Sequence, residues 1–88
     1  MSLGWRIELA RSAAKQLAKL GTAESRRIVE FLKARASEDP RQVGKALSGP
    51  LGDLWRYRVG DYRIICEIQD AALVVLVVRV GHRRELYR

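Results

Sequence analysis

The 88-residue chain has one cysteine, one histidine, two prolines and no long hydrophobic run. A lone Cys66 excludes an internal disulfide and suits a reducing compartment, while one histidine and one cysteine provide no ligand cluster for a metal ion. The longest apolar stretch, residues 71–78, is far shorter than the roughly 20 residues of a membrane-spanning helix. Signal-peptide patterning, a glycine-rich phosphate loop and Ser-His-Asp spacing are absent too. We expect a cytoplasmic protein with no membrane contact, metal or cofactor.

The composition that remains is strongly basic. Seventeen Lys and Arg against ten Asp and Glu give a formal charge of +7, and 48% of the residues are hydrophobic. That apolar content predicts one folded domain over residues 1–88, small enough to bury only about 60–70% of the surface of its chain. A positive electrostatic field attracts nucleic acid, an anionic membrane surface or an acidic protein. A surface that is basic only for solubility is the alternative.

Periodicity predicts an α+β fold with the element order β-α-α-β-β-β. We expect a helical hairpin to pack on one face of a small, mostly antiparallel sheet. Gly21 is suited to end the first helix and Pro40 to stop the second. The predicted strands cover residues 5–9, 54–59, 62–68 and 73–80, and the predicted helices cover 10–20 and 23–37.

Gly60-Asp61 between two alternating runs indicates a two-residue hairpin turn. Side chains alternate between the faces of a strand, so Arg56, Arg58 and Arg63 share one face of this hairpin. Its other face is apolar and comprises Trp55, Tyr57, Val59, Tyr62, Ile64, Cys66 and Ile68. Like charges across a strand pair are destabilising, so a rigid cluster of guanidiniums indicates a bound anion.

The register of the last strand decides where Arg79 points. An odd-length loop after residue 68 places Arg79 on the arginine face, and an even-length loop turns it toward the core. We predict the arginine face, because burying an unpaired guanidinium is costly.

Two further residues suit metal-free cleavage of RNA, in which the 2′-OH attacks its own 3′-phosphate. This route needs an acid, a base and cations at the phosphate. Histidine is the side-chain type that ordinarily changes charge near neutral pH, which makes His82 a candidate acid or base. Tyr87 could stack on a base or relay a proton. An exposed His82 without a role and a Tyr87 that only caps the core are the alternatives.

Three segments together resemble the RelE/ParE toxins, namely 45–49 (KALSG), 54–64 (LWRYRVGDYRI) and 80–88 (VGHRRELYR). The match covers essentially the whole chain. The resemblance implies a toxin of a type II toxin–antitoxin pair that cuts mRNA codons in the ribosomal A site without metal. It implies that Arg63 and Arg83 hold the phosphate and that Tyr87 stacks on the substrate. We expect the RNA-binding residues to be Lys45, Arg56, Arg58, Arg79 and Arg84.

One departure from the family pattern concerns the general base. Some active relatives have lysine or a carboxylate on the second strand, whereas Arg56 and Arg58 stay protonated at neutral pH. His82 is the candidate to replace that base.

Partners and alternative functions also follow from the resemblance. We expect an acidic antitoxin that covers the basic face in a hetero-oligomer, besides the ribosome and mRNA. A ParE-like branch, which inhibits DNA gyrase without nuclease chemistry, is the first alternative. An inactive relative that only binds its antitoxin or nucleic acid is the second.

Overall fold

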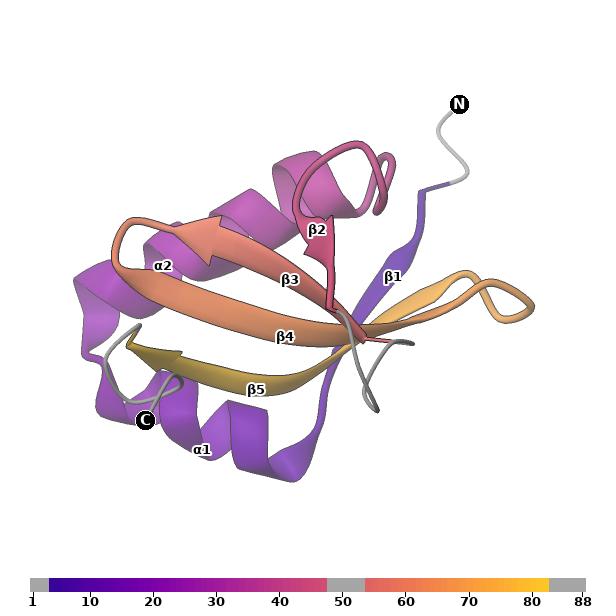
Figure 1. The fold of residues 1–88 in the computed structure, drawn as a ribbon. Coiled ribbons are helices and arrows are strands. Elements are labelled where there is room, and N and C mark those ends of the chain that lie inside the picture. The colour runs from indigo at the N-terminus through magenta and orange to yellow at the C-terminus, as the bar shows by residue number, and fades with distance from the viewer. Residues whose placement is uncertain (1–3, 48–53, 83–88) are drawn as a thin grey trace.

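The computed structural model describes residues 4–47 and 54–82 as a five-stranded sheet covered on one face by helices (Figure 1). The elements are β1 (Arg6–Leu9), α1 (Arg11–Lys19), α2 (Thr22–Phe31), a π-helical turn (Leu32–Ala36), β2 (Lys45–Ala46), β3 (Leu54–Val59), β4 (Tyr62–Gln69) and β5 (Val74–His82). The sheet order is β1-β5-β4-β3-β2. β1 runs parallel to β5, and all other neighbours are antiparallel. The expected α+β architecture is therefore confirmed, with one short strand, β2, added before the hairpin.

The core lies between the helices and the apolar face of the sheet. Ala13 and Leu17 of α1 recur four residues apart, so both point inward, as does Ile28 of α2. The predicted second helix ends in a π-helical turn, in which the Ser37 N–H donates to the Leu32 carbonyl at 2.9 Å. Opposite them the strands contribute the buried residues Tyr57, Ile64, Cys66, Val75, Val77 and Val80.

The predicted hairpin is present with the expected register. Val59 pairs with Tyr62 and Arg58 with Arg63, across a turn whose Gly60 has a φ of +59°. A glycine at that position accepts a positive φ without steric cost. No helix among the described residues is long and apolar enough to cross a membrane.

A β-bulge in β5 sets the position of Arg79. Gln69 pairs with Val74, so the loop between them has the four residues 70–73. The odd-length loop of our prediction is therefore wrong, and by itself this even loop would turn Arg79 toward the core. The register then shifts, because Cys66 pairs with Val77 but Ile65 pairs with Arg79. The extra residue, Val78, returns Arg79 to the arginine face as predicted.

Helix α1 satisfies the backbone of β5 beside this bulge. The Ser12 hydroxyl donates to the Val78 carbonyl at 3.1 Å, and Gln16 Oε1 accepts from the Val80 N–H at 2.6 Å. β1 pairs with β5 only as far as Val77. Beyond the end of β1, polar side chains of α1 thus form the hydrogen bonds to the β5 backbone that a neighbouring strand would form. These bonds hold the bulged part of β5 in place.

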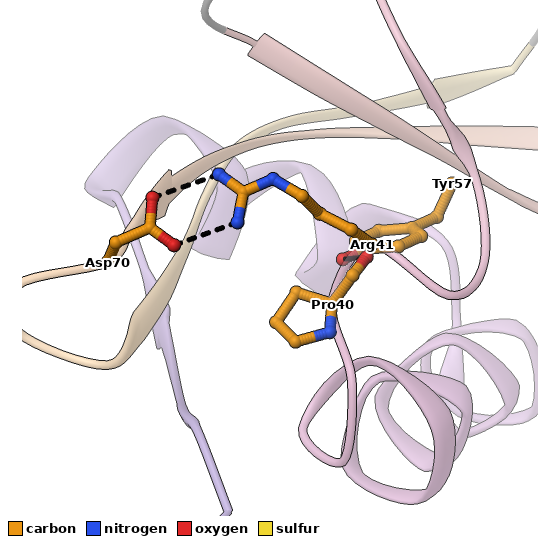
Figure 2. Close-up of polar contacts among 4 residues, drawn as sticks. All are labelled: Pro40, Arg41, Tyr57 and Asp70. Carbon is orange, nitrogen blue, oxygen red and sulfur yellow. Dashed lines mark hydrogen bonds and ion pairs between the residues drawn. The ribbon is translucent and has the colours of Figure 1, made fainter.

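The segment between the helices and β3 is fastened to the sheet by side chains (Figure 2). The Tyr57 hydroxyl donates to the Pro40 carbonyl at 2.7 Å, and Arg41 forms two hydrogen bonds with Asp70 at 2.8 and 2.9 Å. Trp55 Nε1 also donates to the Val43 carbonyl at 2.7 Å. These contacts bring the chain into position to form β2, which the sequence pattern did not predict.

Candidate nucleic-acid interface

Five basic side chains of β2 to β5 lie on the face of the sheet opposite the helices. Pairing places Lys45 beside Arg56, Arg58 beside Arg63, and Arg79 beside Ile65, whose own partner in β3 is Arg56. Cross-strand partners project from the same side of a sheet, so the group spans all four strands from β2 to β5. We call Lys45, Arg56, Arg58, Arg63 and Arg79 the basic surface.

Arg63 is the most enclosed member of the basic surface. It is only 6% exposed, and its Nε has no hydrogen-bond partner among the described residues. Among the described residues, its guanidinium makes only one hydrogen bond, a long one of 3.5 Å from Nη1 to the Tyr62 carbonyl. A buried donor without an acceptor is unfavourable, and an anionic ligand would remove that cost while gaining a charge-assisted hydrogen bond.

Two acidic residues, Glu67 and Glu8, lie on the same face, toward the end of the sheet away from the Gly60 turn. Glu67 is opposite Leu54, four residues along β4 from Arg63, and it accepts a hydrogen bond from Gln69 at 2.8 Å. Glu8 of β1 forms an ion pair with Arg6 at 2.8 Å. Both carboxylates thus have partners of their own. The end of the sheet near Gly60 therefore presents predominantly positive charge.

Of the remaining predicted site residues, only His82 is among the described residues, and it lies away from the basic surface. His82 pairs with Tyr62, and the two rings meet edge to face at 5.7 Å on the helix-covered side of the sheet. There His82 borders a pocket with Gln16 and Lys19 of α1. Arg83, Arg84 and Tyr87 lie outside the described residues, and so does the 48–49 part of the family-like loop. Their roles stay predictions.

Two other reactive side chains are part of the core. Burial raises the pKa of the Cys66 thiol to about 12, and it also raises the pKa of the Tyr57 hydroxyl well above its usual range. Both groups therefore stay protonated at neutral pH. Neither suits nucleophilic attack or proton transfer, which agrees with assigning Cys66 and Tyr57 to packing.

The Arg41–Asp70 ion pair lies at the end of the sheet away from the Gly60 turn. It joins the segment before β2 to the turn between β4 and β5, as Figure 2 shows. The hydrogen bonds from Arg41 lower the pKa of the Asp70 carboxyl, and those to Asp70 raise the pKa of the Arg41 guanidinium. No sequence pattern indicates this pair, because 29 residues separate its members.

This pair predicts a specific dependence of stability on pH. Because the pKa of folded Asp70 is lowered, its contribution is present above the ordinary aspartate pKa and is lost as pH falls through the lowered value. We expect Asp70→Asn to lower the urea midpoint at neutral pH and to leave it unchanged at strongly acidic pH. Asp61→Asn, at the exposed hairpin turn, is the matched control. An equal Asp70→Asn effect at every pH would contradict this linkage.

Comparisons with known proteins agree on one family. The family model described as the ParE toxin of type II toxin–antitoxin system, parDE, matches residues 7–87. The toxin RelG of Mycobacterium tuberculosis is 33% identical over 82 residues, which cover 93% of this chain and 94% of that relative.

Solved structures show the same relationship. The toxin–antitoxin complex RelBE2 from M. tuberculosis contains a chain with a TM-score of 0.86 and 30% identity, over 94% of this chain and 95% of that one. The RelBE toxin–antitoxin complex of E. coli gives a TM-score of 0.75 at 25% identity, over 89% and 95% of the two chains. The fold of this chain is thus the fold of chains in solved RelBE complexes.

Proposed function

The chain belongs to the RelE/ParE family of type II toxins, and from that premise we propose that it is a ribosome-dependent endoribonuclease that cuts mRNA codons in the A site. The basic surface is the observation that carries this proposal. It offers five cations on a rigid sheet, where guanidinium forks can hold phosphate oxygens bidentately. The activity would take place in the cytoplasm, where ribosomes translate.

The chemistry we propose is attack of the ribose 2′-OH on the adjacent phosphate, with no metal involved. Negative charge on the nonbridging oxygens grows as the pentacoordinate phosphate forms, and preorganised cations stabilise that charge best when they need not move. Arg63 meets this condition because it is enclosed and has a donor without a partner among the described residues. Arg56, Arg58, Arg79 and Lys45 would hold the flanking phosphates.

Proton transfer is assigned to groups other than arginine, because arginine as a side-chain type does not give up its proton in proteins. We assign this step to Tyr87, with Arg83 as a second phosphate ligand, and not to His82, whose ring packs against Tyr62 on the helix-covered side of the sheet. The basic surface alone would therefore bind RNA and lower the barrier, and the acid and base would complete the reaction.

The proposed partner is an acidic antitoxin that covers the basic surface. The two solved relatives described above are toxin–antitoxin complexes. With a formal charge of +7, this chain would attract a partner of opposite charge, and an antitoxin seated on the arginines would exclude RNA.

A translation extract tests the proposed activity directly. Adding the purified protein should truncate mRNA at codons held in the A site, and the same mRNA without ribosomes should stay intact. The name of the matching family model supports a second candidate, a ParE-like inhibitor of DNA gyrase. Intact mRNA together with accumulating gyrase–DNA cleavage complexes would establish that function instead.

The position of His82 yields a sharp prediction. Because its ring lies with Tyr62 on the helix-covered side, we expect His82→Gln to change the cleavage rate by less than about tenfold. Loss of a general acid or base would slow cleavage by about 10²–10⁴-fold. Single-turnover cleavage in the extract distinguishes these outcomes, with Lys19→Gln in the neighbouring helix as the control. A slowdown in the larger range would assign proton transfer to His82 and require its ring to leave Tyr62.

A further inference from the structure

A small pocket opens where the basic surface meets the end of α2. Its volume is about 260 Å³, and it is lined by Phe31, Val43, Gly44, Lys45, Arg56 and Arg58. One part of the lining is aromatic and aliphatic, and the other carries three cations. Two of these cations, Arg56 and Arg58, also pair with β4 residues on the open face, so the pocket is continuous with the basic surface.

The walls of this pocket are held firmly. The Phe31 ring packs edge-on against the buried Tyr57 at 5.7 Å, and the Val43 carbonyl accepts from Trp55 Nε1. Gly44 has a φ of +82°, and a Cβ there would collide with the Arg56 carbonyl and lie 2.8 Å from Tyr57 Cδ1. The loop therefore approaches β3 as closely as a backbone without a side chain allows.

From this lining we propose that the pocket binds one base of the RNA strand whose phosphates lie on the basic surface, an inference that rests on the proposed function. Its volume is below the roughly 300–1,000 Å³ of sites for drug-sized ligands, which suits a single base. Aromatic side chains stack on every base, and arginine planes do so as well. The apolar wall of the pocket would therefore contact the base, and the three cations beside it would contact the phosphate of the same nucleotide.

The composition of the chain provides a direct reporter. Phe31 is the only phenylalanine, so the protein labelled with 4-fluorophenylalanine gives one ¹⁹F resonance. Adenosine 5′-monophosphate at millimolar concentration should shift it through the ring current of the base. Ribose 5-phosphate, which has the same phosphate and no base, should leave it in place. No shift with the nucleotide, or an equal shift with the sugar phosphate, would overturn the base site.

Two further measurements separate this inference from related ones. Arg58→Gln should weaken the nucleotide about tenfold or more, and Lys19→Gln on α1 should not. A short oligoribonucleotide should bind more tightly than the monophosphate, because several phosphates then meet the basic surface. Equal affinities would overturn assignment to an RNA strand. None of these binding measurements needs catalysis. If the nucleotide shifts the Phe31 resonance but the protein leaves mRNA uncut, the nuclease proposal is refuted and the base site is retained.

Discussion

Replacing Arg63 with glutamine is expected to lower the rate of A-site mRNA cleavage by about 10²–10³-fold, the usual effect of removing one preorganised donor to a developing oxyanion. The side chain is 94% buried, the complement of its 6% exposure, and its Nε has no acceptor among the described residues. Glutamine keeps an apolar stem and hydrogen-bonding atoms but loses the positive charge. Single-turnover cleavage with saturating ribosomes measures the chemical step.

The stability of the same variant shows whether this loss is catalytic. No carboxylate among the described residues pairs with Arg63, so removing its charge should leave the free energy of unfolding unchanged or slightly higher. Arg63→Lys retains the charge without the planar fork and should fall between glutamine and the native residue. Arg26→Gln on the exposed side of α2 provides a charge-matched control. A wild-type rate for Arg63→Gln would remove Arg63 from the proposed mechanism.

The hairpin was predictable because every local signal agreed. Gly60-Asp61 defines the turn, and the turn defines the pairing of Arg58 with Arg63. Alternation then assigns each side chain to a face, and helix periodicity covers the apolar one. The sequence alone therefore places the arginines of β3 and β4 together.

The rest of the basic surface depends on contacts between distant parts of the chain. Arg79 reaches it through a bulge whose backbone is held by Ser12, 66 residues earlier. Lys45 reaches it because Tyr57, Trp55 and Asp70 hold the preceding segment against the sheet. Neither a bulge nor a two-residue strand produces a recognisable hydrophobic period, so sequence patterns could not place them.

Tyr57→Ala should produce the largest change in stability, a loss of about 3–5 kcal/mol in the free energy of unfolding, as for other buried aromatic truncations. Tyr57 is fully buried and packs against Phe31. A small domain has only about 5–15 kcal/mol in total, so the variant would approach global unfolding. Urea denaturation followed by tryptophan fluorescence measures the change.

Tyr57→Phe separates the hydroxyl from the ring. It keeps the volume but leaves the buried Pro40 carbonyl without its 2.7 Å donor, so we expect a loss of about 1–3 kcal/mol. Tyr57 stands between Arg56 and Arg58 on β3, and its hydroxyl fastens the segment that leads to Lys45. Tyr57→Phe should therefore also weaken RNA binding by the folded protein. A variant that lost only stability would bind RNA as tightly as the native protein once folded. Unchanged RNA affinity at full folding would show that the hydroxyl stabilises the core without positioning the basic surface.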